Sequence, residues 1–426
     1  MIRFYNARVL MPDMSIINGE VITDGAKIDY AGKAQKSGKF EREINLNGNL
    51  IMPSFKNAHT HSAMTFLRSY ADDLPLQEWL FTKIFPMEAK LTGEDIYTLT
   101  KLAYAEYLTS GITACFDMYF EPDFVAKAAT ETGFRTIMCG SVSGSDKPEE
   151  VDSALTRLET FYNKFKDFDR DGIVSYRLGF HAEYTTSLPI MEGIAALAGK
   201  YKAPVYTHNS ETVSETADCV KRYGKTPVEL FCSLGLHEYG GGGFHCVHLT
   251  PADIKLMHRY NIYAVSNPAS NAKLASGIAP LTDLVAGGVK IALGTDGPSS
   301  NNALDMFREM YLACVLQKLK NNDAAAMPAG TILEAATNGG AYAMGIPECA
   351  DLTAGNKADL IVIDLSQPNM HPINDIVKNL VYSGSKQNVK LTMINGKILY
   401  EDGEFKTLDI EKIRFEANTI IRRMAE

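Results

Sequence analysis

The chain has 426 residues, of which 46% are hydrophobic and 22% are charged, a composition that indicates a folded globular protein and excludes a disordered one. The net charge is −9 and the lysines and arginines are dispersed, so the sequence predicts neither nucleic-acid binding nor attachment to an acidic membrane. The seven cysteines are scattered, the N-terminus lacks the apolar stretch of a signal peptide, and no uncharged apolar run reaches about 18 residues. We therefore expect a cytoplasmic protein with reduced thiols and no membrane-spanning helix.

Both ends of the chain have the alternating apolar and polar pattern of short β-strands. Residues 1–52 contain RFYNARVL, SIINGEVITDG and KIDYAG, and residues near 355–405 contain KADLIVIDL and VKLTMINGKILYEDGEF. We predict that segments 1–52 and 351–426 meet in one small β-sandwich domain built from both termini. Residues 409–424 have helical spacing and are expected to form a terminal helix.

The middle of the chain, residues 53–350, alternates apolar strand candidates with longer amphipathic segments such as EDIYTLTKLAYAEYLTS and FVAKAATETG. Eight such β/α units predict an α/β fold, a (β/α)8 TIM barrel, as the catalytic domain. The glycine run Gly240–Gly243 lacks the Gly-Lys-Ser/Thr ending of a phosphate loop, and we interpret it as a flexible loop before the sixth strand. The eight predicted strands span residues 49–61, 111–120, 135–142, 176–184, 204–211, 243–249, 262–271 and 290–297.

Histidines mark the ends of several predicted strands. His59 and His61 are two residues apart at the end of the first strand, and side chains at that spacing point to the same face. His181, His208 and His245 lie at the ends of the fourth, fifth and sixth strands, so five of the nine histidines occupy such positions. Because the active sites of TIM barrels lie at the C-terminal ends of the strands, this placement predicts a common site at the barrel mouth.

These side chains predict a metal site. Neutral imidazole is a good ligand for divalent metals, and two converging imidazoles repel each other when both are protonated, whereas a shared cation removes that repulsion. Three histidines and one carboxylate, with an open position for water, form a catalytic metal arrangement. We predict that His59, His61, His208 and Asp296 are the metal ligands.

The strand-end motifs resemble those of the amidohydrolase superfamily. They are AHTH at 58–61, HNSE at 208–211, HCVH at 245–248, SNPASNAKL at 266–274 and GTDG at 294–297. The resemblance covers essentially the whole chain and is closest to the mononuclear aminohydrolase branch, which contains the 5′-methylthioadenosine/S-adenosylhomocysteine deaminases and related chlorohydrolases. It implies a TIM barrel, one divalent metal ion (Zn2+, or Fe2+ in some members) and hydrolytic deamination of a heterocycle. The fourth predicted strand, YRLGFHAEY, lacks the lysine that bridges two metals in binuclear members, so we expect a single metal ion.

Three residues are expected to carry the chemistry. Asp296 can bind the metal and accept a proton from a water molecule whose pKa the metal lowers. Glu211 lies three residues beyond the ligand His208 and is the candidate acid that protonates a ring nitrogen, as a non-ligand glutamate does in zinc deaminases of another fold. His245 is expected to hold the attacking oxygen or to polarise the leaving amine.

The resemblance also implies residues that bind the substrate. Trp79, the only tryptophan, lies in LQEWLFTKIFPMEAKLT, where it can stack on a planar base or anchor a helix to the barrel. The resemblance favours stacking on adenine, with Glu88 accepting hydrogen bonds from the ribose 2′ and 3′ hydroxyl groups. It also places His181 near the substrate. Glu211, as the acid, would contact the substrate as well.

The region that would bind the 5′ group departs from the family pattern. Members that act on S-adenosylhomocysteine hold its carboxylate with arginines after the third strand, whereas residues 139–150, CGSVSGSDKPEE, contain no arginine. Arg135 precedes this segment, Arg157 follows it, and Lys147 offers only a point charge. This departure favours a small uncharged 5′ group, as in methylthioadenosine, 5′-deoxyadenosine or adenosine.

The predicted function is metal-dependent hydrolytic deamination of adenine nucleosides, of the 5′-methylthioadenosine, 5′-deoxyadenosine, adenosine or S-adenosylhomocysteine type, to ammonia and the inosine analogue. One alternative is another hydrolase of the same scaffold, acting on an amino- or chloro-heterocycle of the guanine or triazine type, because such enzymes share the metal residues. Another alternative is a non-catalytic binding or assembly protein, against which the complete set of candidate ligands argues. The expected partner is a small purine nucleoside, and self-association into a homo-oligomer is left open.

Overall fold

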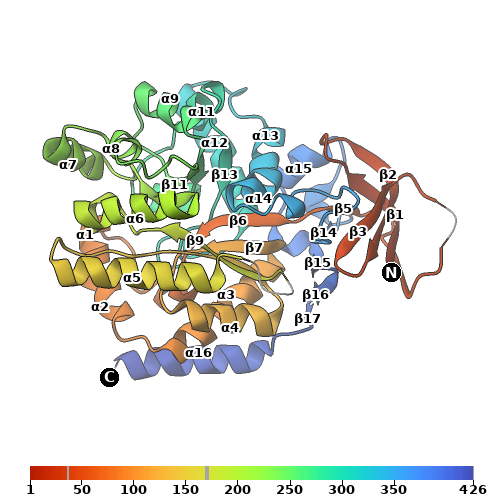
Figure 1. Cartoon of the computed structure of the whole chain (residues 1–426). Coiled ribbons are helices and arrows are strands. Elements are labelled where there is room, and N and C mark those ends of the chain that lie inside the picture. Colours follow the sequence, from red (N-terminus) through yellow and green to blue (C-terminus); the bar gives the residue numbers. More distant parts are fainter. Residues whose placement is uncertain (36–37, 168–171, 426) are drawn as a thin grey trace.

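The computed structural model describes residues 1–35, 38–167 and 172–425, which form a parallel barrel and a smaller sheet (Figure 1). The eight barrel strands lie side by side in chain order and pair in parallel, which confirms the predicted TIM barrel. The Asp296 N–H donates to the His59 carbonyl at 3.0 Å and so connects the end of the last strand to the first. The barrel strands are β6 (Phe55–Thr60), β7 (Ile112–Asp117), β8 (Arg135–Cys139), β9 (Val174–Gly179), β10 (Val205–Asn209), β11 (Gly241–His245), β12 (Ile262–Ser266) and β13 (Ile291–Leu293).

Helices connect the barrel strands and cover the outside of the barrel (Figure 1). Four of them begin with a threonine that forms a capping box with an acidic residue three positions later, and this satisfies N–H groups that have no partner within the helix. The helices are α3 (Gly93–Thr109), α4 (Pro122–Thr132), α5 (Pro148–Phe165), α6 (Leu188–Tyr201), α7 (Val213–Tyr223), α8 (Pro227–Ser233), α9 (Pro251–Arg259), α10 (Pro268–Lys273), α11 (Leu281–Ala286), α12 (Met306–Asn321), α13 (Ala329–Glu334) and α14 (Gly340–Ala343). Three short helical turns lie among them, η3 (Glu183–Thr185), η4 (Ala335–Gly339) and η5 (Pro347–Cys349).

A long excursion follows β6 before the chain continues into α3. It contains short helical segments rather than one long helix, and it carries Trp79 and Glu88 to the barrel mouth. Its elements are η1 (Ser62–Leu67), α1 (Leu76–Trp79), η2 (Leu80–Ile84) and α2 (Phe85–Glu88).

The strands of both termini form one sheet beside the barrel, as predicted, with the red and blue strands of Figure 1 next to each other. The contact between the two halves is made by β5 and β14, which pair antiparallel. The domain boundaries at residues 52 and 350 stay a prediction. The sheet contains β1 (Ile2–Leu10), β2 (Ile16–Asp24), β3 (Lys27–Gly32), β4 (Arg42–Asn45), β5 (Leu50–Pro53), β14 (Leu360–Ile363), β15 (Val389–Ile394), β16 (Lys397–Glu401) and β17 (Glu404–Phe405), accompanied by η6 (Pro368–Met370), α15 (Ile376–Tyr382), η7 (Lys386–Asn388) and the terminal helix α16 (Ile410–Ala425).

Several details of the predicted strands are wrong. The predicted strands 176–184 and 262–271 run past the ends of β9 and β12 into the helical segments η3 and α10. The first predicted strand, 49–61, is two strands, because β5 belongs to the small sheet and β6 to the barrel, with Ser54 between them. The residues on both sides of this break are buried, so the apolar pattern runs on without interruption. The glycine run is not a loop, since β11 begins at Gly241. A Cβ atom there would lie 1.9 Å from the Val205 carbonyl oxygen, so the glycine permits the close approach of β10.

A buried ion pair connects the barrel to the small sheet. Arg135, the first residue of β8, donates from Nε to Asp359 Oδ2 at 2.9 Å and from Nη2 to Asp359 Oδ1 at 3.0 Å. Both side chains are buried. Arg135 therefore has a structural role, and it does not line the cavity at the barrel mouth. All seven cysteines are buried and unpaired, and no helix among the described residues is both long and apolar enough to cross a membrane.

Candidate active site

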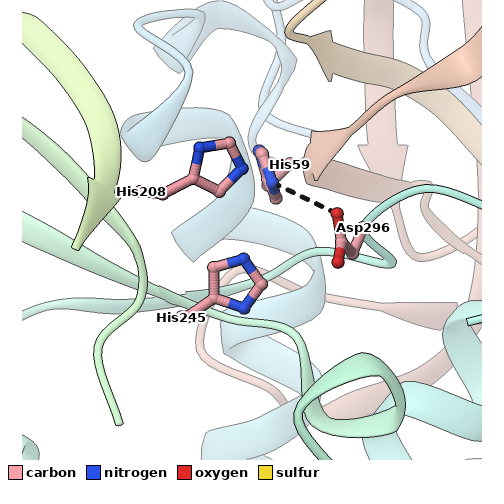
Figure 2. Close-up of side chains that lie close together, drawn as sticks. All are labelled: His59, His208, His245 and Asp296. Carbon is pink, nitrogen blue, oxygen red and sulfur yellow. Dashed lines mark ion pairs between the residues drawn. The ribbon is translucent and has the colours of Figure 1, made fainter. Parts of the chain in front are cut away.

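Three strand ends bring the four predicted metal ligands together. His59 lies in β6 and His61 follows its last residue, His208 lies in β10, and Asp296 follows β13. His245, the last residue of β11, joins them, and Figure 2 shows His59, His208, His245 and Asp296 pointing toward a common centre. Each of these four offers a ligand atom, and the four atoms lie within 4.8 Å of one another.

His61 lies against the same group. Its Nε2 is 3.2 Å from Asp296 Oδ1 and 3.3 Å from His208 Nε2, while His59 Nε2 is 3.5 Å from the same carboxylate oxygen. The four predicted ligands are therefore all gathered, and His245 is a fifth donor that the predicted set omitted as a ligand. The backbones of His245 and Asp296 are in the left-handed region, with φ of 71° and 59°, a strained conformation that often occurs at functional sites.

The hydrogen bonds of the imidazoles leave lone pairs facing the centre. His61 Nδ1 lies 2.6 Å from the Met118 carbonyl oxygen, and His208 Nδ1 lies 2.6 Å from the His181 carbonyl oxygen. A carbonyl only accepts, so each Nδ1 carries a proton, and each Nε2, which presents a lone pair when its ring is neutral, faces the centre. Two lone pairs 3.3 Å apart repel unless a proton or a cation lies between them. His59 is fully buried and neither ring nitrogen has a hydrogen-bond partner among the described residues, so the donor set fits a divalent metal.

The electrostatics of the group support this interpretation. Burial lowers the pKa of His59 to about 3, and burial together with the surrounding histidines holds the pKa of His208 well below its ordinary value. Burial alone would lower the pKa of His61 as well, but the adjacent Asp296 carboxylate raises it to about 9. The pKa of Asp296 is well below its usual value, because the nearby imidazoles of His59, His61 and His245 outweigh the effect of burial. The carboxylate is therefore ionised and His59 and His208 are neutral, which are the forms that bind metals, whereas His61 holds a proton near neutral pH that a bound metal ion would displace.

Glu211 lies beside His245 in the lining of the site. Its Oε2 is 3.7 Å from His245 Nε2, and its Oε1 accepts a hydrogen bond from the Ser276 hydroxyl at 3.2 Å. Burial raises the pKa of Glu211 although the neighbouring His245 opposes that shift, so the carboxyl holds a proton more readily than an exposed glutamate does. The Glu211 N–H donates to Glu215 Oε2 at 2.7 Å, which holds this turn in place.

Four supporting residues were not predicted individually. The hydroxyl groups of Ser270 and Ser300 donate to Asp296 Oδ2 at 2.6 and 2.8 Å, so one carboxylate oxygen is restrained while the other faces the histidines. The amide oxygen of Asn271 lies 2.7 Å from His245 Nδ1. Ser270 and Asn271 belong to the motif SNPASNAKL, which signalled the region without revealing these contacts, whereas Ser300 and Glu215 had no distinguishing signal.

A cavity beside the metal-binding group is lined by all four predicted substrate-binding residues. Its empty volume is about 730 Å³, part of which is open solvent. Glu88 accepts a hydrogen bond from the Tyr119 hydroxyl at 2.7 Å, and burial raises its pKa to about 7 although this hydrogen bond opposes the shift. The lining includes His61, Trp79, Glu88, His181, His208, Glu211, His245 and Asp296, and the fully buried His59 is absent from this lining.

Comparisons with known proteins identify the family. The profile of the amidohydrolase family matches residues 50–399. A 5-methylthioadenosine/S-adenosylhomocysteine deaminase from Syntrophomonas wolfei is 41% identical over 430 residues, which cover 98% of this chain and 99% of the relative. The solved structure of an adenosine deaminase from Xanthomonas campestris with bound zinc matches with a TM-score of 0.93 and 32% identity, over 100% of this chain and 98% of that chain.

A chlorohydrolase shares the architecture at a lower sequence identity. The structure of an atrazine chlorohydrolase from Arthrobacter aurescens matches with a TM-score of 0.91 and 21% identity, over 99% of this chain and 100% of that one, and at this identity the match concerns the fold alone. The resemblance predicted from the strand-end motifs is confirmed by the family profile and by the full-length relatives. The chain belongs to the amidohydrolase family.

Proposed function

We propose that this protein is a metal-dependent hydrolase that deaminates adenine nucleosides and releases ammonia and the inosine analogue. One observation carries the proposal: a single cavity joins the metal-binding group, the buried acid Glu211 and the buried acceptor Glu88. The relatives named as deaminases, which align along nearly the whole chain, support the same chemistry.

The donor set suits one divalent metal ion, and the zinc in the Xanthomonas campestris structure supports Zn2+ as that ion. We propose His59, His61, His208 and Asp296 as its ligands, with His245 directed at the same centre from the side of Glu211. A bound metal would lower the pKa of water, so that a nucleophile is available near neutral pH.

The protein's own side chains then move the protons. Water adds to the ring carbon that bears the amine, and the adjacent ring nitrogen must gain a proton. Glu211 is the donor for that nitrogen, because its burial favours the protonated form and it lines the cavity next to His245. Asp296 is ionised, so it can accept one proton of the attacking water and pass it to the leaving amine. As the C–N bond breaks and ammonia leaves, the hydroxyl group of the tetrahedral centre gives its proton to the Glu211 carboxylate, which restores the acid. His245 polarises the amine or holds the attacking oxygen.

The upper part of the cavity suits a nucleoside. Trp79 is buried in the lining and offers an aromatic face for the base, and His181 lines the same cavity. Glu88 has one oxygen bound to the Tyr119 hydroxyl, and the remaining acceptor positions of the carboxylate suit the vicinal hydroxyl groups of ribose.

A substrate panel tests the proposal. The purified, metal-loaded protein is incubated with adenosine, 5′-deoxyadenosine, methylthioadenosine, S-adenosylhomocysteine, adenine and guanine, and ultraviolet absorbance and ammonia release are both followed. We expect turnover of the nucleosides and little or none of the free bases. Protein with bound metal that turns over no adenine nucleoside would refute the proposal, and a chlorinated or aminated triazine would then be the next substrate to try.

A further inference from the structure

Glu309 is a buried acidic residue that the proposed chemistry does not use. It lies in the first turn of α12, is fully buried, and forms no ion pair among the described residues. Its Oε2 accepts a hydrogen bond from the Ala269 N–H at 2.9 Å, and its Oε1 accepts one from Asn301 Nδ2 at 2.7 Å. Ala269 is the second residue of α10 and Asn301 lies in the turn after β13, so Glu309 connects two segments that follow different barrel strands.

The contact with α10 takes the place of a side-chain cap. Asn267, at the N-terminal end of α10, makes no side-chain hydrogen bond to the helix, and the first N–H groups of a helix have no acceptor within it. Glu309 provides such an acceptor for Ala269. The next residue, Ser270, donates to Asp296 Oδ2 at 2.6 Å, so this contact is one residue away from the metal-binding group.

The contact with the turn after β13 reaches the same carboxylate from the other side of the sequence. Asn301 Nδ2 donates to Glu309 Oε1 and, at 2.6 Å, to the Thr295 carbonyl oxygen. The turn is therefore held to α12 and to the residue before Asp296. Ser300, which precedes Asn301, donates to Asp296 Oδ2 at 2.8 Å. Both segments that restrain Asp296 are thus anchored to the side chain of Glu309.

A carboxyl group suits this position because both of its partners are N–H donors. Burial raises the pKa of Glu309 to about 8, although the two hydrogen bonds oppose the shift. In either protonation state each oxygen keeps a lone pair for its donor. A glutamine has one acceptor oxygen and one NH2 group, so it would satisfy one of the donors and oppose the other. Glu309→Gln therefore keeps the size of the side chain and breaks one of the two connections.

We propose that Glu309 is a positioning residue, which holds α10 and the turn after β13 at the separation where both serines bind Asp296. The two segments belong to different β/α units, so without this link each could shift without the other. Asp296 would then lose a donor on Oδ2 and the fixed direction of Oδ1 toward the histidines. The inference rests on the proposed function, in which Asp296 is a metal ligand, but metal affinity tests it without any substrate.

A mutant cycle tests this role. Chelator competition measures the Zn2+ dissociation constant of the wild type, of Glu309→Gln, of Ser270→Ala/Ser300→Ala and of the variant that combines all three substitutions. We expect Glu309→Gln to weaken Zn2+ binding about three- to tenfold, whereas residues that contact a metal ligand directly commonly cost about 10- to 100-fold. Because Glu309 acts through the two serines, the triple variant should bind Zn2+ within about twofold of the double variant. A residue that only stabilises the fold would weaken binding by the same factor in both backgrounds.

Glu20 offers a matched control, because it is also a fully buried glutamate that joins two segments. Its Oε1 accepts from the Gln35 N–H at 2.6 Å, and its Oε2 accepts from Arg3 Nε at 2.8 Å. It lies in β2 of the small sheet, so Glu20→Gln should leave the Zn2+ affinity unchanged. Urea unfolding checks that each variant is folded, and if Glu309→Gln is not, Glu309→Asp takes its place in the cycle, since it keeps two acceptor oxygens on a shorter side chain.

The outcomes separate this role from the proposed function. An unchanged Zn2+ affinity in the folded Glu309 variant would overturn the role of Glu309, as would a loss of equal size with and without the two serine hydroxyl groups. A wild type that binds Zn2+ but deaminates no adenine nucleoside would refute the proposed function alone, because the cycle still measures the coupling to Glu309. A wild type that binds no Zn2+ would overturn both.

Discussion

Replacing Ser270 with alanine removes one of the two hydroxyl groups that orient Asp296. The carboxylate is almost fully buried, Oδ1 faces His59 and His61, and Oδ2 accepts hydrogen bonds from Ser270 at 2.6 Å and Ser300 at 2.8 Å. Without Ser270, a single hydroxyl donor is left to restrain the rotation of the side chain. The substitution removes only one oxygen atom, so the packing around it changes little.

The size of the effect follows from the charge of the acceptor. A hydrogen bond to a charged group contributes about 1.5–3 kcal/mol, and about 1.4 kcal/mol corresponds to a tenfold change in an equilibrium or rate constant. Substitution of residues that orient metal ligands commonly costs about 10- to 100-fold in metal affinity or activity. We therefore expect Ser270→Ala to weaken metal binding or to lower kcat/KM by about 10- to 100-fold.

Chelator competition measures the metal dissociation constant of this variant, and ammonia release at saturating metal measures kcat/KM. Ser110→Ala is the matched control, because Ser110 is also a buried serine, but it donates to the Leu304 carbonyl at 2.7 Å, away from the metal-binding group. Its metal affinity should equal that of the wild type. If folded Ser270→Ala keeps both metal affinity and kcat/KM within about twofold of the wild type, the hydroxyl groups do not orient Asp296 and the reasoning fails.

Three further substitutions test other parts of the site and fold. Glu211→Gln should lower kcat by about 10²- to 10⁴-fold with the bound metal unchanged, measured by ammonia release and metal analysis, and loss of the metal would instead indicate a structural role. Glu88→Gln should raise KM for adenosine but not for its 2′,3′-dideoxy analogue, and equal increases would exclude binding of the ribose hydroxyl groups. Arg135→Met should destabilise the protein by about 3–5 kcal/mol in urea unfolding, because it leaves Asp359 buried and unpaired, and Arg135→Met/Asp359→Leu should recover most of this loss. Burial raises the pKa of Asp359, but Arg135 lowers it by more, so the pKa lies below its ordinary value. The ion pair therefore stabilises the protein above about pH 4, and its contribution should be lost as the pH falls below that value. A difference in unfolding free energy between the wild type and the double variant that does not change at acidic pH would contradict this assignment.

The sequence by itself determined the barrel and most of the candidate site. Each predicted barrel strand exists near its predicted position, because runs of buried apolar residues separated by amphipathic helices specify a β/α repeat locally. His59 and His61 could be assigned to one face from their spacing, and the strand ends of a barrel necessarily meet at one mouth. That is why side chains as far apart in the chain as His59 and Asp296 could be grouped before the structure was known.

Only the tertiary structure decided which polar side chains support that group and which arginine is buried in an ion pair. Ser270 and Ser300 contact Asp296 because of how helix α10 and the turn after β13 pack together, and no periodicity in the sequence encodes that contact. Arg135 and Arg157 flank the same segment, yet Arg135 is buried against Asp359 whereas Arg157 is exposed on helix α5. The physical reason is that local spacing determines the direction of a side chain relative to its own strand or helix, whereas its partners depend on how distant segments pack against one another.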